Sequence, residues 1–193
     1  MLINKEVKMS IQVLKRYFTV EDYQKMGEVG VFKADENNEL VAGEIIKMSP
    51  IGKRHAACVN RCNHLFYQIL GDQILISVQN PIQLNNLSQP QPDLVLLQPR
   101  PDFYEERHPQ PSDIILLIEV SDTTIDFDQQ VKIPLYCQSD IQEVWLIDLN
   151  QNIVRVYRTP TANGYQSIQF FTVEQTLTLA AFPEFNININ QIF

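Results

Sequence analysis

The chain has 193 residues, of which 45% are hydrophobic and 20% are charged, a composition typical of a single globular domain that buries its own core. Its 15 Lys and Arg stand against 23 Asp and Glu, and the formal net charge of −8 argues against a protein that coats nucleic acid through bulk positive charge. The first residues include charges where a signal peptide needs an apolar run, and no stretch is apolar for the length of a bilayer, so we expect a cytoplasmic protein without a membrane segment.

The first third of the chain alternates between helix and strand patterns. Thr19, followed by acidic residues, is typical of a helix N-cap and predicts a short helix. Residues 39–49 form an apolar-rich run that predicts a strand, which a Pro and a Gly then end. Over 53–70 apolar residues recur at helical spacing and Gly71 follows them, so we expect a second, longer helix there.

The rest of the chain is rich in strand patterns, with one more helix among them. Residues 113–120 hold a nearly continuous apolar run, which is typical of a strand covered on both faces. Residues 123–139 predict a helix, which Pro134 should kink or delay. Further strands are expected at 73–84, 93–98, 143–149, 153–159 and 165–173, and a tail at 182–193 that packs back on the sheet. This order of elements predicts an α/β fold in which a mixed central β-sheet is flanked by helices.

Three carboxylates stand in or at the ends of predicted buried strands. Glu44 lies inside the first strand, Asp93 opens an apolar run, and Glu119 closes another. Carboxylates in such places are costly unless their charge is compensated, and neighbouring carboxylates raise one another's pKa. A divalent cation that prefers hard oxygen ligands, Mg²⁺ or Mn²⁺, would compensate them. Taken singly, Asp93 also fits a turn that precedes a strand, and Glu119 also fits the end of a strand that faces solvent. The prediction of a metal site therefore depends on the three carboxylates together.

One cation is placed to assist such a site. Lys132 lies on the helix that follows Glu119, and Asp128 precedes it by one helical turn, so the two share a helix face and are expected to pair. Tyr136 continues the same face. If this face looks back at the strand ends, Lys132 reaches the metal site, with Asp128 as its supporting partner.

A histidine and two cysteines in the second predicted helix raise the question of a zinc site. His55, Cys58 and Cys62 follow helical spacing on one face, but His64 falls on the opposite side of the helix. Cysteine in an apolar stripe is typically a small buried hydrophobe, and with Cys137 the spacings predict no disulfide framework. We therefore favour no zinc here. His55 is expected either to support the acidic site, as a contact to phosphate or water, or to be structural.

Several of these stretches, in this order, resemble the PD-(D/E)XK nuclease superfamily, and within it a group of small bacterial restriction-endonuclease-like proteins. The stretches are "QPDLVLL", "IEVSDTT…FDQQVKIPLY" and "EVWLIDLNQNIVRVYR". In addition, "VAGEIIKMSPIGKRHAACVNRCNHLF" is similar to that group's first strand–helix unit, and "FPEFNININQIF" is similar to its closing segment. The resemblance covers residues 39–193.

The resemblance implies roles for individual residues. As catalytic residues it implies Glu44, Asp93, Glu119 and Lys132. It implies that the metal, Mg²⁺ or Mn²⁺, is held by Asp93, Glu119 and the backbone carbonyl of Val120. The family's typical lysine, two residues after the second acid, is absent because Ser121 stands there. In this group a lysine relocated to the following helix replaces it, and Lys132 occupies that place.

The resemblance also implies a domain plan and a function. It predicts one restriction-endonuclease-like domain over 1–193, with an N-terminal strand and helix extension at 1–38, a nuclease core at 39–150 and C-terminal strands at 151–193. The implied activity is metal-dependent cleavage of DNA by an endonuclease, alone, with a protein partner or as a homodimer. A non-catalytic binding or regulatory module that keeps the fold stays open, because the acidic net charge and the Ser at position 121 fit it as well.

Overall fold

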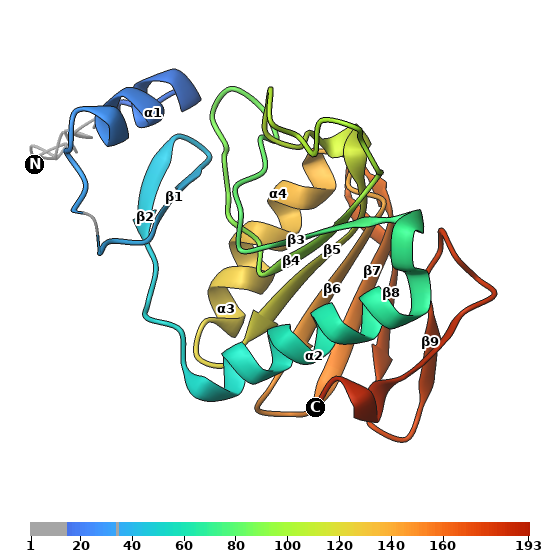
Figure 1. Cartoon of the computed structure of the whole chain (residues 1–193). Helices are drawn as coiled ribbons and strands as arrows, with labels where there is room; N and C mark the ends of the chain where they lie inside the picture. Colours follow the sequence, from blue (N-terminus) through green and yellow to red (C-terminus); the bar gives the residue numbers. More distant parts are fainter. Residues whose placement is uncertain (1–14, 34) are drawn as a thin grey trace, which may run out of the picture.

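A mixed six-stranded sheet forms the centre of the computed structural model, which describes residues 15–33 and 35–193 (Figure 1). The strands lie in the order β3-β4-β5-β6-β7-β8. Their bounds are β3 Leu75–Val78, β4 Leu94–Leu97, β5 Ile114–Ser121, β6 Glu143–Asp148, β7 Ile153–Thr161 and β8 Gly164–Phe171. Strands β5 and β6 run parallel, whereas the other neighbours run antiparallel. The predicted α/β fold with a mixed central sheet is confirmed.

Helix α2 (Lys53–Leu70) covers one face of this sheet (Figure 1). Its buried Cys62 and Phe66 share a hydrophobic core with Leu116 and Ile118 of β5. Within 182–193, Ile187, Ile189 and Ile192 join the same core, so the expectation that this tail packs back is confirmed, and Leu177 before it joins them. The structural tail starts earlier than the predicted 182–193, because β9 (Thr176–Thr178) pairs with β10 (Asn186–Asn188), and it ends in the 3₁₀ turn Ile189–Gln191.

The crossover between the parallel strands β5 and β6 covers the opposite face. It consists of α3 (Ile125–Phe127), a π-helical turn (Asp128–Lys132) and α4 (Ile133–Gln138). Ile133 and Tyr136 of the crossover pack with Leu117 and Leu146 of the sheet in a second core. Successive residues of a strand point to opposite faces, so β5 fills both cores, which accounts for its continuous apolar run.

The helix irregularity expected at Pro134 is present as a π-helical turn. The backbone N–H of Ile133 bonds to the carbonyl of Asp128, five residues back instead of four. A proline ring inside a helix clashes with the carbonyl four residues earlier, so a widened turn just before Pro134 relieves that clash.

The N-terminal part confirms one predicted element and corrects another. Helix α1 (Val20–Glu28) begins at the N-cap Thr19, whose hydroxyl accepts a hydrogen bond from the backbone N–H of Asp22. The single strand predicted at 39–49 is wrong, because the chain reverses and forms the antiparallel hairpin β1 (Asn38–Val41) and β2 (Glu44–Lys47). Ala42 and Gly43 form its two-residue turn, with φ of 50° and 80°.

Other short elements complete the description. The strand predicted at 73–84 is shorter, because after β3 the chain leaves the sheet at Gln79, which has a φ of 52°. Single 3₁₀ turns lie at Gly71–Gln73 and Pro111–Asp113. In the part of the chain that the structure describes, no helix is both long and apolar enough to cross a bilayer.

Candidate active site

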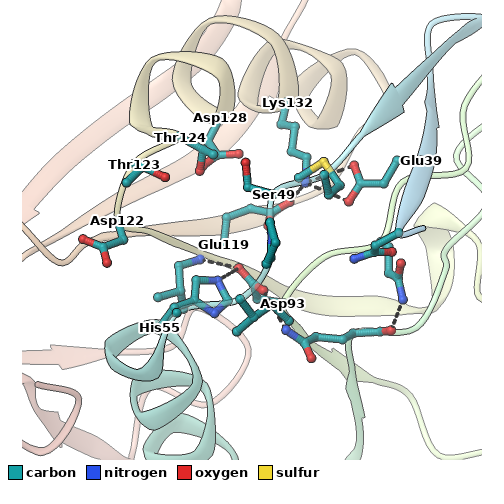
Figure 2. A pocket seen from close by; sticks show the side chains of 18 residues that line it. Glu39, Ser49, His55, Asp93, Glu119, Asp122, Thr123, Thr124, Asp128 and Lys132 are labelled. Atoms are coloured by element: carbon teal, nitrogen blue, oxygen red, sulfur yellow. Dashed lines mark hydrogen bonds and ion pairs between the residues drawn. The ribbon is translucent and has the colours of Figure 1, made fainter. Parts of the chain in front are cut away.

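A cavity of about 180 Å³ lies where the first turn of α2, the start of β4 and the end of β5 meet the crossover helix (Figure 2). The side chains of Glu39, Asp93, Glu119, Asp128 and Lys132 line it together. The predicted site residues found here are His55, Asp93, Glu119, Val120, Asp128 and Lys132. Long-range strand pairing thus gathers groups that are scattered along the sequence.

Glu119 lies in the buried part of β5 and faces the crossover helix. It is 3% exposed. Alternation along the strand puts it on the same face as Leu117, which packs in the core under α4. Its Oε1 accepts hydrogen bonds from Lys132 Nζ at 3.1 Å and from the Tyr136 hydroxyl at 2.5 Å. Both donors therefore come from the helix face that looks back at the strand end.

Lys132 is buried between two carboxylates from different elements. Its Nζ lies 3.1 Å from Glu119 Oε1 and 3.2 Å from each oxygen of Glu39, a residue of β1 (Figure 2). Removing such charges from water costs several kcal/mol, which only close contacts offset. A lysine thus lies beside the strand-end glutamate although Ser121 stands where a lysine would follow in the strand.

Glu44 does not lie in this cavity, so the expected position of the supporting carboxylate is corrected. Glu44 opens β2, its side chain is 49% exposed, and it pairs with Lys15 Nζ at 2.8 Å. The two-residue turn reverses the chain before Glu44, whereas Glu39 lies on the same face of β1 as the buried Val41. Glu39 therefore occupies the place in the cavity that we expected Glu44 to take.

Burial and mutual repulsion set the charges in the cavity. Burial raises the pKa of Glu119 to about 8, with the nearby carboxylates adding to the rise and Lys132 opposing it. Burial likewise raises the pKa of Glu39 and of Asp128. For Lys132, burial alone would lower the pKa, but Glu119, Glu39 and the other carboxylates outweigh it and hold the pKa above its ordinary value. The ammonium therefore stays charged.

Asp93 lies directly before β4 and is held by three groups. Its Oδ2 accepts a hydrogen bond from the Val120 backbone N–H at 2.8 Å and lies 3.0 Å from His55 Nε2, and its Oδ1 accepts one from Gln79 Nε2 at 3.3 Å. Burial lowers the pKa of His55, but the contact with Asp93 outweighs burial and leaves that pKa above its ordinary value. The other ring nitrogen of His55, Nδ1, is buried without a hydrogen-bond partner. His55 thus fixes Asp93 from the first turn of α2.

Asp128 has a different partner from the one predicted. Its Oδ2 accepts a hydrogen bond from Thr124 Oγ1 at 2.8 Å, and Thr124 in turn lies 3.3 Å from the Ser121 hydroxyl. Residues four apart lie over one another only in a regular α-helix, and the π-helical turn between Asp128 and Lys132 alters that alignment. The predicted direct pair is therefore replaced by the pairs of Lys132 with Glu39 and Glu119.

The donor set of the cavity fits a hard divalent cation. Asp93 and Glu119 supply carboxylate oxygens, and the backbone of Val120 lies beside Asp93. Glu39 Oε2 is within ion-pair distance of Lys132 but lacks a hydrogen-bond partner, so the cavity retains an acceptor that is not fully compensated. Across residues 15–33 and 35–193, no three His, Cys, Asp or Glu side chains lie close enough to hold a metal by themselves. A cation here would therefore need further oxygen ligands, such as a backbone carbonyl, water or phosphate.

The side chains considered for zinc do not meet at one point. His55 faces Asp93, whereas Cys58 and Cys62 are fully buried in the core beneath α2. The interaction between the two thiols lowers the pKa of Cys58 and raises that of Cys62, and burial adds to the rise at Cys62.

Sequence reasoning missed two groups of the site: Glu39, which lines the cavity, and the hydroxyl of Tyr136, which bonds to Glu119. Gly43 within an apolar run is a local hint of a turn, but Ala42 before it is not a residue that favours the positive φ of a two-residue hairpin turn. Such a turn puts Glu39 and Val41 on one face. Tyr136 was expected on the face of Lys132, but nothing in the sequence indicated that its hydroxyl donates to Glu119.

The fold is shared with a solved structure of a protein described as "a putative nuclease belonging to DUF820" from Anabaena variabilis ATCC 29413. The two chains superpose with a TM-score of 0.68 at 18% sequence identity, and the match covers 91% of this chain and 97% of that chain. The likeness establishes that this chain has the α/β fold of that class of protein.

The sequence itself gives the family. The model of the Uma2 family, described as "Putative restriction endonuclease", matches residues 20–190. The chain therefore belongs to the Uma2 family. No curated protein sequence matches the chain.

Proposed function

We propose that this chain is a metal-dependent endonuclease that hydrolyses phosphodiester bonds in DNA. The observation that carries the proposal is the buried Lys132, whose Nζ lies 3.1 Å from Glu119 in a cavity that also holds Asp93. A fixed cation next to a pair of acidic side chains is suited to a reaction in which a negatively charged phosphate is attacked. Membership of the Uma2 family supports the nuclease class.

The residues that would hold the metal are Asp93, Glu119 and Val120 through its backbone carbonyl. When bound, Mg²⁺ or Mn²⁺ would polarise the scissile phosphate and lower the pKa of a water molecule that attacks it. In this proposal Glu39 takes the supporting position first expected for Glu44, because Glu39 lines the cavity.

The side chains of the site, those that line the cavity and Tyr136 next to Glu119, have separate tasks in the proposal. Lys132, held charged by its carboxylate neighbours, stabilises the negative charge that develops on the phosphate and takes the place of the lysine missing at position 121. Tyr136 and Glu39 keep Glu119 and Lys132 in fixed positions through their hydrogen bonds. His55 orients the carboxylate of Asp93.

The test is cleavage of supercoiled plasmid and of labelled duplex and single-stranded DNA, with Mg²⁺ or Mn²⁺ and with EDTA as the metal-free control. We expect Asp93→Ala and Lys132→Met to lower the rate by about 100-fold or more, the loss typical when an electrostatic stabiliser is removed. Glu44→Ala is the matched control, because Glu44 lies outside the cavity, and it should retain wild-type activity. Circular dichroism would establish that each variant is folded.

Two outcomes would contradict the proposal. One is a wild-type protein that cleaves none of these substrates with either metal. The other is cleavage that persists unchanged in Asp93→Ala, which would indicate a contaminating nuclease or another site.

The second candidate, a non-catalytic binding or regulatory module, is favoured by one feature of the cavity. Glu119 is already bonded by Lys132 and Tyr136, and Asp93 by Val120, His55 and Gln79, so both carboxylates are compensated by the protein itself. Titration calorimetry with Mn²⁺ separates the two functions. Binding that is lost in Asp93→Ala supports the nuclease, whereas no binding by the wild-type protein supports the module.

A further inference from the structure

The edge strand β8 is unusually open for the last strand of a sheet. Among the described residues it pairs with β7 alone, so its outer edge presents backbone N–H and C=O groups without strand partners. Proteins normally protect such edges with short strands, charged side chains or Pro. Strand β8 has eight residues and none of these devices, whereas the opposite edge strand, β3, has only four residues.

The face of β8 beside this edge is apolar and uncovered. Ile168 is 50% exposed and Phe170 is 59% exposed. Both line a groove of about 510 Å³ between α4 and the end of the sheet, together with Pro134, Tyr157 and Tyr165. Ile168 and Phe170 belong both to the open strand and to the lining of the groove, so a partner that pairs with β8 approaches these side chains.

Charge restricts which partner fits. Residues 159–173, which span the end of β7, the turn and all of β8, contain no charged side chain. The whole chain has a net charge of −8, so two copies repel each other over most of their surfaces. A contact between copies is therefore favoured where charge is absent, and this uncharged hairpin is such a place.

We propose that two copies of this chain associate through β8, which pairs antiparallel with β8 of the second copy. A strand related to its own copy by a two-fold axis meets an identical surface, so the backbone groups of both edges are satisfied at once. With the axis near Ile168, in the middle of the strand, Ile168 lies opposite Ile168 of the second copy and Phe170 opposite Gln166 of the second copy. The two central sheets then form one continuous sheet. This association does not depend on the nuclease proposal.

The first test is the mass of the protein in solution, measured by sedimentation and by light scattering over a wide range of concentration. We expect the wild type to have the mass of two chains. Ile168→Lys places two like charges at the axis and should raise the dissociation constant about 100-fold or more. The matched control is Phe103→Lys, because Phe103 is 76% exposed in the loop between β4 and β5, and it should keep the mass of two chains.

The second test is cross-linking, which does not require a destabilising change. Residues directly opposite in an antiparallel pair have Cβ atoms about 4.5–5.5 Å apart, so Ile168→Cys should give a covalent dimer on mild oxidation. The native Cys58, Cys62 and Cys137 are buried and should not interfere. Phe103→Cys is the control and should give none.

Either of two results would overturn the association. One is a wild-type mass of a single chain at every concentration, which would leave the edge to another partner or to solvent. The other is a mass of two chains that Ile168→Lys leaves unchanged, with no cross-link in Ile168→Cys, which would place the contact on another face. If circular dichroism shows that Ile168→Lys is unfolded, the cross-linking of Ile168→Cys alone decides whether the two copies associate through β8.

Discussion

Lys132 balances the charges of the cavity, since it lies between Glu39 and Glu119 with all three side chains buried. Lys132→Met keeps the length of the side chain but leaves Glu39 and Glu119 in the interior without a cation, so each carboxyl must either stay charged without compensation or take up a proton. Removing one partner of a buried ion pair typically costs about 3–5 kcal/mol. We therefore expect the free energy of unfolding, measured by urea denaturation at neutral pH, to fall by about that amount.

Two further variants test the origin of that loss. Adding Glu39→Gln to Lys132→Met removes one of the stranded charges, so the double variant should be more stable than the sum of the two single effects predicts. Lys25→Met is the matched control, because Lys25 pairs with Glu21 on the exposed face of α1 and an exposed pair contributes little. Equal stability of Lys132→Met and wild type would contradict a charged, buried Lys132.

Part of this cavity was predictable from the sequence at the level of single residues. Asp93 opens one apolar run, Glu119 closes another, and Lys132 lies on a helical face, and such local patterns place side chains well. The choice between Glu39 and Glu44 depended instead on the backbone, because the turn between them requires positive φ at Ala42. Strand alternation alone does not reveal such a turn and therefore does not decide between Glu39 and Glu44.

At the scale of the element, the π-helical turn before Pro134 decides where Lys132 points. Pro134→Ala removes the ring and restores a backbone N–H, so a regular helix becomes accessible and Lys132 should rotate away from Glu119. We expect Lys132, which an amine-reactive reagent should not reach in the wild type, to become labelled in Pro134→Ala, as measured by mass spectrometry. Pro111→Ala, at the first position of a distant 3₁₀ turn, is the control. Continued protection of Lys132 would show that packing, not Pro134, holds the turn.

The hairpin β1–β2 is a second element on which the cavity depends, because it carries Glu39. Gly43 has a φ of 80°, and a Cβ added there would lie 2.6 Å from Cβ of Tyr17. Gly43→Ala should therefore destabilise the hairpin by about 1–3 kcal/mol. Faster amide hydrogen exchange over 38–47 would report this loss.

A control for the hairpin is available in α1. Gly27 lies inside that helix with no atom within 4 Å of an added Cβ, so Gly27→Ala should leave the protein unchanged or slightly more stable. If amide hydrogen exchange over 38–47 is the same in Gly43→Ala as in the wild type, Tyr17 moves aside without cost and the prediction is contradicted.

At the scale of the whole molecule, the class of fold followed from the order of elements, but the arrangement of the strands did not. The pairing of β5 with β6 is parallel and long-range, and it follows from the crossover helix between them. For the tail, the sequence predicts that it packs on the sheet but does not predict where it is attached. Its attachment involves a side-chain network that joins the neighbouring strands β6 and β7 to the tail, which no local pattern indicates.

That network is centred on Glu143 of β6, which is buried. Its carboxylate accepts hydrogen bonds from the indole N–H of Trp145, the guanidinium of Arg158 on β7 and the backbone N–H of Ala180 in the tail. Glu143→Ala leaves all these donors without their acceptor, so we expect the free energy of unfolding to fall by about 3–5 kcal/mol.

The place of the loss should identify its cause. Because Ala180 precedes β10, the tail should become sensitive to protease in Glu143→Ala before the rest of the chain does. Glu184→Ala removes an exposed carboxylate from the same tail and should change neither stability nor cleavage. The opposite result is that Glu143→Ala unfolds in one step while its tail stays protected from protease. The apolar contacts of Leu177 and Ile187 would then suffice to attach the tail, and the network would stabilise β6 and β7 instead.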